Sequence, residues 1–106
     1  MIAWSEIAEV GRDIGLAANA ERVILFGSHA RGQAGEDSDL DILVVAESDQ
    51  PRHKRSRELY RRVRTHHVAL DILVLTPAEV ARGMKTEVSF VSQAVNEGKT
   101  IYVRGN

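Results

Sequence analysis

The sequence contains no cysteine, only two prolines and few aromatic residues. The absence of cysteine excludes a disulfide scaffold, a thiolate metal site and a thiol nucleophile, and it fits a protein of the reducing cytoplasm. The apolar runs are short, far from the roughly 20 residues that a membrane-spanning helix needs. The amino terminus has neither a basic region nor a long apolar stretch, so we expect no signal peptide and no membrane association.

The length and composition are those of a small globular protein. The chain has 106 residues, and we expect a single domain over residues 1–106. Hydrophobic residues make up 43% of the chain and charged residues 27%, a balance that excludes a wholly disordered protein. The formal net charge of −1 argues against direct binding of nucleic acid.

The near-zero net charge hides two neighbouring segments of opposite sign. Residues 36–49 include six acids and no lysine or arginine, whereas residues 52–64 include seven cations against the single acid Glu58. The basic stretch has two interpretations, a solvated helix face or a docking surface for an acidic partner or RNA. The segregation is a first indication of a functional site.

Hydrophobic periodicity and breaking residues predict alternating helices and strands. Strands are expected at 22–26, 40–46, 68–75 and 100–103. Helices are expected at 51–65 and after the capping residues Ser5, Thr76 and Thr86. The aromatic residues Trp4, Phe26 and Phe90 are expected in the core. These elements predict an α/β (α+β) fold in which helices flank a small mixed β-sheet.

One internal repeat places two acids together. The sequence Leu-Asp-Ile-Leu-Val-Val at 40–45 returns as Leu-Asp-Ile-Leu-Val-Leu at 70–75. Two strands with a helix between them, in about 30 residues, form a βαβ unit with parallel strands. If the repeats lie level, Asp41 and Asp71 are neighbours, and Asp39 shares a face with Asp41 because it is two residues away.

Three carboxylates at one end of a sheet repel one another, and this arrangement is hard to justify by stability. A divalent cation resolves the repulsion, and Mg²⁺ is the usual choice where phosphates complete the coordination. Two such ions can stabilise the attacking and leaving oxygens of a phosphoryl transfer. In the alternative interpretation Asp39 and Asp41 are solvated turn and strand-edge acids, and Asp71 pairs with an arginine.

A second motif precedes the acids. Gly27-Ser28 ends a strand and opens a helical turn, where backbone N–H groups and a hydroxyl favour an anion. Gly27 would let the backbone approach a phosphate closely. Alone, a Gly-Ser pair is common and means little. His29 follows in the spacer, where we expect no catalytic role.

Together these residues resemble the motif of the minimal nucleotidyltransferases of the DNA polymerase beta superfamily. The likeness spans essentially the whole chain and is carried by Gly27-Ser28, Arg31-Gly32, Ser38-Asp39-Leu40-Asp41 and the later acid Asp71. It implies the nucleotidyltransferase fold and ATP as substrate. It implies that Gly27 and Ser28 hold the triphosphate, with Arg31 touching a phosphate or bracing an acid. It also implies that Asp39, Asp41 and Asp71 are catalytic and bind two Mg²⁺ ions.

The resemblance also implies a partner. The chain ends after its last predicted strand with no acceptor-recognition domain, so the acceptor would be a partner protein, a very small ligand or one enclosed by self-association. Stand-alone members of the family often act as antitoxins that transfer AMP from ATP to a tyrosine of a HEPN-domain toxin. A small-molecule nucleotidyltransferase, similar to the aminoglycoside-modifying enzymes, and a non-enzymatic antitoxin that only binds its toxin stay open as alternatives. The nucleobase, the acceptor and the choice between hetero-oligomer and homodimer are also open.

Overall fold

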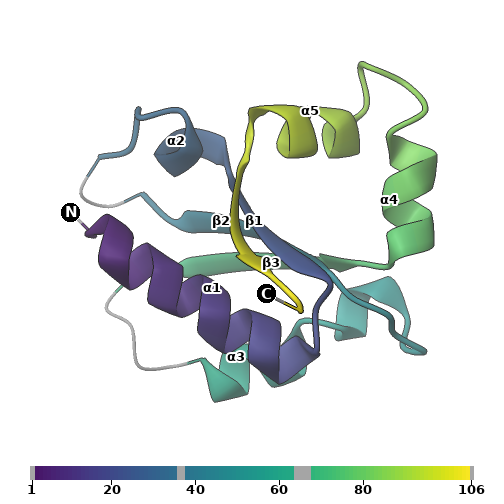
Figure 1. Ribbon diagram of the computed structural model, residues 1–106, viewed down its shortest axis with the longest axis horizontal. Coiled ribbons are helices and arrows are strands. Elements are labelled where there is room, and N and C mark those ends of the chain that lie inside the picture. The colour runs from purple at the N-terminus through teal and green to yellow at the C-terminus, as the bar shows by residue number, and fades with distance from the viewer. Residues whose placement is uncertain (1, 36–37, 64–67, 106) are drawn as a thin grey trace.

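The computed structural model describes residues 2–35, 38–63 and 68–105. Its centre is a four-stranded mixed sheet with the order β3-β2-β1-β4 (Figure 1). The middle strands β1 and β2 are antiparallel, and so are β1 and β4, whereas β2 and β3 are parallel. The sheet consists of β1 (Arg22–Phe26), β2 (Leu40–Val45), β3 (Leu70–Leu75) and β4 (Lys99–Val103). The expected mixed α/β fold is therefore confirmed.

Helices pack on both faces of this sheet (Figure 1). On one face lie α1 and α3, and on the other α4 and α5, while α2 follows β1 at one end of the sheet. The helical elements are α1 (Trp4–Ala18), α2 (Gly27–Ala30), the 3-10 turn η1 (Arg52–Lys54), α3 (Arg57–Arg62), α4 (Pro77–Gly83) and α5 (Phe90–Glu97). None of the helices in the described ranges could cross a membrane.

Strand alternation divides the apolar side chains between two cores. Val23, Leu25, Ile42 and Val44 belong to the core beneath α1. The core beneath α4 and α5 contains Ile24, Leu43, Val45, Leu75, Val80 and Ala94. Because residues two apart share a face, the acids that begin β2 and β3 lie on the α4–α5 side.

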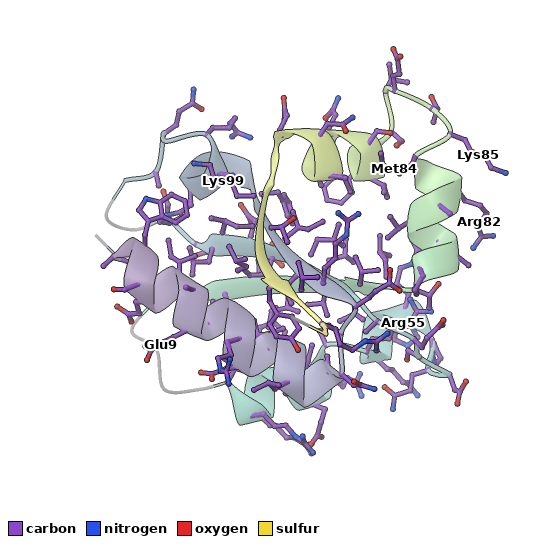
Figure 2. All side chains as sticks on the ribbon, viewed as in Figure 1. Glu9, Arg55, Arg82, Met84, Lys85 and Lys99 are labelled. Carbon is purple, nitrogen blue, oxygen red and sulfur yellow. The ribbon has the colours of Figure 1, made fainter. Side chains whose placement is uncertain are left out.

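The connection from β2 to β3 differs from the single helix expected at 51–65. The structure has η1, a turn and the six-residue α3 instead, and residue 65 lies outside the described residues. Arg55 occupies the turn, where its guanidinium donates to the backbone oxygens of Gln50 and Val74 and to Glu79 at the base of α4 (Figure 2). These distant partners, which local periodicity cannot reveal, hold the turn between the two helical pieces.

Two predicted helix starts are wrong. The first helix begins at Trp4 with Ala3 as its N-cap, so Ser5 lies inside its first turn. The last helix is capped by Ser89 rather than Thr86, and Val88 is 83% exposed. The capping box of Thr76 and Glu79 is confirmed at the start of α4.

Serine hydroxyls explain the late start of α5. The Ser92 hydroxyl donates to the Thr86 carbonyl at 2.6 Å, and the Ser89 hydroxyl donates to the Gly83 carbonyl at 2.6 Å. Ser92 is buried, so these bonds hold the α4–α5 connection as a loop.

Two of the three aromatic residues expected in the core are half-exposed. Trp4 is 53% exposed and lies beneath the Lys99 ammonium, 4.7 Å from the ring centre. Phe90 is 50% exposed and packs edge-on against Phe26. Both exposed rings stand in the first turn of a helix, where one side remains open to solvent.

Candidate active site

The predicted pairing of the two repeats is present in the sheet. Asp41 and Asp71 are direct partners across the parallel strands β2 and β3, and all six residues of each repeat pair in the same register. Their side chains therefore leave the same face of the sheet on strands about 4.8 Å apart. Asp41 is half-buried and Asp71 is exposed. The structure thus places one carboxylate within the site and a second at its open edge.

The electrostatics of Asp41 reflect this crowding. Burial raises the pKa of Asp41, and the negative charges of Asp71 and Asp39 raise it further. The charges of His29 and Arg31 lower the pKa of Asp41 and offset part of the effect. The ionised form of Asp41 is therefore disfavoured by its burial and by the two neighbouring carboxylates.

Gly27 brings the Gly-Ser turn against the acids. Its backbone has φ +73°, a conformation that residues with a side chain rarely adopt, and a methyl group at this position would overlap the Asp41 carboxylate. Asp41 also pairs with Phe26, the residue before Gly27, across the antiparallel strands. The turn after β1 and the first acid of β2 are thus in direct contact, and this contact requires glycine.

The other predicted nucleotide-binding residues lie on or just after α2. Ser28 is the second residue of this helix and is half-buried. Arg31 is exposed, and its Nε donates to the Gln33 side chain at 3.1 Å. The charge of Arg31 also lowers the pKa of Asp41, although less than the other causes act on it.

His29 makes a contact that the sequence did not predict. Its side chain is buried, and its Nε2 lies 3.2 Å from the carbonyl oxygen of Ser38, the residue before Asp39. The position next to Ser28 was the only sequence signal available, since the contact crosses nine residues of chain.

The donor set fits a magnesium ion by its chemistry. Carboxylate oxygens are the hard ligands that Mg²⁺ prefers, and Asp39 and Asp71 both act electrostatically on Asp41. Within the described residues, no group of three or more acidic or histidine side chains lies close enough together to hold a metal ion. Asp39 and Asp71 are exposed, so their side chains are free of the packing that would hold them away from an ion.

The arginines of the basic stretch differ in their contacts. Arg55 is largely buried and pairs with Glu79 at 2.6 Å, and Arg52 pairs with the other oxygen of the same carboxylate at 3.1 Å. Arg61 and Arg62 are exposed and lie near Glu58. Arg55 therefore belongs to the fold, whereas Arg61 and Arg62 are exposed enough to contact a partner.

The comparison with known families agrees with this geometry. The model of the nucleotidyltransferase domain matches residues 7–104. The chain belongs to this family. The resemblance drawn from the Gly-Ser and Asp-x-Asp motifs is thereby confirmed, and the chain is a nucleotidyltransferase.

Individual relatives support the same assignment. The Methanocaldococcus jannaschii protein named "putative protein adenylyltransferase MJ0141" is 34% identical over 94 residues, which are 87% of this chain and 91% of that protein. A nucleotidyltransferase structure from Sulfolobus solfataricus has a TM-score of 0.64 at 23% identity and covers 94% of this chain and 79% of that one.

A second similar structure is a toxin–antitoxin complex with AMP-PNP. It has a TM-score of 0.57 at 21% identity over 98% of this chain and 76% of that one. At these identities the two solved structures establish the shared fold alone.

Proposed function

We propose that this nucleotidyltransferase transfers AMP from ATP to a hydroxyl group of a partner protein. The observation that carries the proposal is the juxtaposition of Asp41, Asp71 and Gly27, which places a paired acid site directly beside the turn of the Gly-Ser motif. The similarity to a protein named as a protein adenylyltransferase supports AMP as the group and protein as the acceptor. The toxin–antitoxin structure with AMP-PNP supports a bound adenine nucleotide.

Each part of the site has its own role in this proposal. Gly27 and Ser28 hold the β- and γ-phosphates, and Arg31, whose charge lowers the pKa of Asp41, steadies either an acid or a phosphate. Asp39, Asp41 and Asp71 hold two Mg²⁺ ions. When bound, these ions supply charge neutralisation of the triphosphate and lower the pKa of the acceptor hydroxyl.

The exposure of Asp71 suits the acceptor side of the reaction. The acceptor oxygen forms a bond to the α-phosphorus, the bond from that phosphorus to the bridging oxygen breaks, and pyrophosphate leaves with the electron pair. The hydroxyl proton passes to the Asp71 carboxylate, which faces solvent and is therefore reachable by a protein side chain. Asp41, half-buried beside Gly27, stays with the nucleotide.

The partner in this proposal is a toxin. A toxin–antitoxin complex is among the structures that share this fold, and it supports an antitoxin role. In this proposal, following the family resemblance, a tyrosine of a cytoplasmic HEPN-type toxin receives AMP. The same observation favours a second function, neutralisation of the toxin by binding alone. The two functions differ in whether the partner gains mass.

The decisive experiment incubates a candidate toxin with the protein, ATP and Mg²⁺ and follows the intact mass of the toxin. With the wild-type protein, we expect the mass of the toxin to rise in steps of one AMP and the toxin to be neutralised. The double variant Asp39→Asn with Asp41→Asn should give no mass change. The matched control Glu47→Gln with Asp49→Asn removes two exposed acids from the same acidic run and should transfer normally.

The outcomes separate the candidate functions. Neutralisation by the Asp39/Asp41 double variant without any mass change would replace the enzymatic function with the binding antitoxin. Transfer to an added aminoglycoside but to no protein would indicate a small-molecule nucleotidyltransferase.

A further inference from the structure

The acids of the proposed site follow an irregular connection from α2. Residues 31–39 carry no helix or strand in the described part of this connection. Ser38 makes a local turn there, since its hydroxyl accepts from the Gly35 N–H at 2.9 Å and its own N–H donates to the Gly35 carbonyl. These contacts shape the turn but do not fix its distance from α2.

The buried imidazole of His29 connects α2 to this turn. His29 follows Ser28 directly on α2 and is only 8% exposed, and its Nε2 lies 3.2 Å from the Ser38 carbonyl. A carbonyl oxygen only accepts, so this bond requires the hydrogen of the imidazole to be on Nε2. The bond thus joins the residue after Ser28 to the residue before Asp39.

We propose that His29 is a positioning residue that sets the separation between the Gly27-Ser28 turn and the acidic pair Asp39 and Asp41. The inference rests on the proposed function, because it assumes that the turn holds the triphosphate and the acids hold Mg²⁺. One bound nucleotide must contact the Gly27-Ser28 turn and the Mg²⁺ ions held by the acids at the same time. A shift of the acids relative to the turn by about 1 Å is enough to impair transfer severely, since in-line attack tolerates little misplacement.

Burial makes this bond suited to the task. His29 lies on α2, which begins directly after β1, so the position of its side chain is fixed by the end of a sheet strand. The bond is part-buried, since His29 is buried and Ser38 is half-buried, and such a bond orients its partners more strongly than a fully exposed one. At the other end, Leu40 begins β2, and its N–H donates to the Ala69 carbonyl at 2.9 Å. The segment with Asp39 is therefore held between the sheet and the imidazole.

Two substitutions separate the hydrogen bond from packing. His29→Phe keeps a flat ring of similar size but has no donor. His29→Gln keeps a nitrogen donor at a similar distance from the backbone. His53→Gln removes an exposed histidine from η1 and serves as the matched control.

The first measurement is the Mg²⁺ concentration that half-saturates ATP binding, determined by calorimetry with folded protein at fixed ATP. His29→Phe should raise this concentration about 10-fold, the effect of losing one hydrogen bond of ordinary strength. His29→Gln should recover most of the loss, and His53→Gln should match the wild type. A purely structural role would lower the melting temperature of His29→Phe without moving the Mg²⁺ requirement, and that result would overturn the proposal.

The second measurement needs no nucleotide. Amide hydrogen exchange at residues 38–41 of the apo protein should quicken in His29→Phe and stay near the wild-type rate in His29→Gln. An unchanged exchange rate at residues 38–41 in His29→Phe would refute the proposal that His29 restrains this segment. A wild type that fails to bind ATP with Mg²⁺ refutes the proposed function, while the exchange data still decide whether His29 restrains the acidic segment.

Discussion

Asp41 and Asp71 stand side by side on parallel strands, on one face of the sheet, in a register that pairs every residue of the two repeats. Like charges at this separation destabilise the folded state unless a cation intervenes. The close pair of carboxylates therefore lowers the stability of the fold, and we expect a ligand that neutralises their charge to bind beside them.

The first prediction concerns the apo protein. Because the pKa of Asp41 is raised on folding, its ionisation destabilises the native state as the pH rises above about 3.8, the ordinary value of an aspartate, through the folded pKa. Asp41→Asn should therefore raise the melting temperature at pH 7 in the presence of a chelator. The gain should disappear in acid, where the wild-type carboxyl is protonated.

The control for this prediction is Asp49→Asn, which removes an exposed acid and should leave the melting temperature nearly unchanged. When Mg²⁺ and ATP are added, the wild type should melt at a higher temperature than Asp41→Asn, because the ligands stabilise the wild type alone. A lower melting temperature for Asp41→Asn in chelator would contradict the repulsion between the carboxylates.

The second prediction compares two glycines. Gly27 and Gly32 have φ of +73° and +71°, but a methyl group at Gly27 would meet the Asp41 carboxylate and one at Gly32 would meet nothing within 4 Å. Gly32→Ala should cost about 1–2 kcal/mol for the backbone conformation alone. Gly27→Ala should cost more and should also abolish ATP binding, as denaturant unfolding and calorimetry can show. Equal effects of the two substitutions would argue against the contact with Asp41.

The sequence was most informative where the determinants are local. The strand at 22–26 has the predicted bounds, the repeat predicted the register of Asp41 and Asp71, and the Thr76-Pro77-Ala78-Glu79 run predicted a capped helix. Each of these depends on residues within a few positions of one another or on an internal repeat. Spacing alone was therefore sufficient.

Prediction from the sequence was poorest where distant side chains decide the backbone. The bonds of Arg55 to Val74 and Glu79 cross 19 and 24 residues, and they divide a stretch whose composition favours one helix. The bond of His29 to Ser38 lies within a motif whose spacer positions carry no general signal. Half-exposure of Phe90 likewise depends on where α5 starts, which Ser89 and Ser92 determine.

The third prediction concerns Glu79. Hydrogen bonds from Arg55, the Thr76 N–H and Arg52 lower the pKa of Glu79 to about 2. Because the folded pKa lies below the ordinary value of 4.5, the charged form stabilises the protein above that pH, and the stabilisation is lost as the pH falls through about 2. Glu79→Gln should cost about 1.5–3 kcal/mol at pH 7, the range for hydrogen bonds to charged groups.

Urea unfolding as a function of pH tests this expectation. The stability difference between wild type and Glu79→Gln should shrink as the pH falls from about 4.5 to about 2. Glu58→Gln is the control, because the exposed pairs of Glu58 with Arg61 and Arg62 at 3.6 and 3.5 Å should contribute less than about 0.5 kcal/mol. A difference that is constant with pH would show that the charge of Glu79 is not responsible.

The fourth prediction concerns the exposed arginines. Charge reversal at Arg61 and Arg62 should leave unfolding and ATP binding unchanged, because both side chains lie largely in solvent. If this face docks the toxin, transfer of AMP should fall while ATP binding persists. Arg55→Glu cannot serve in this test, since it would place two acids together with Glu79 and destabilise the fold itself.

The last prediction ranks the residues of the proposed site. Removal of a carboxylate that holds Mg²⁺ eliminates charge stabilisation of the transition state, so Asp39→Asn or Asp41→Asn should reduce AMP transfer far more than a hundredfold. Ser28→Ala removes one hydroxyl contact to a phosphate, about 0.5–1.5 kcal/mol, and should slow transfer roughly 10-fold. Ser48→Ala removes a hydroxyl that accepts from the exposed Gln50 N–H, away from the proposed site, and should have no effect. Rates of AMP incorporation into the toxin give this ranking directly. A Ser28 variant as inactive as the Asp41 variant would mean that the hydroxyl does more than hold a phosphate, and a fully active one would remove Ser28 from the site.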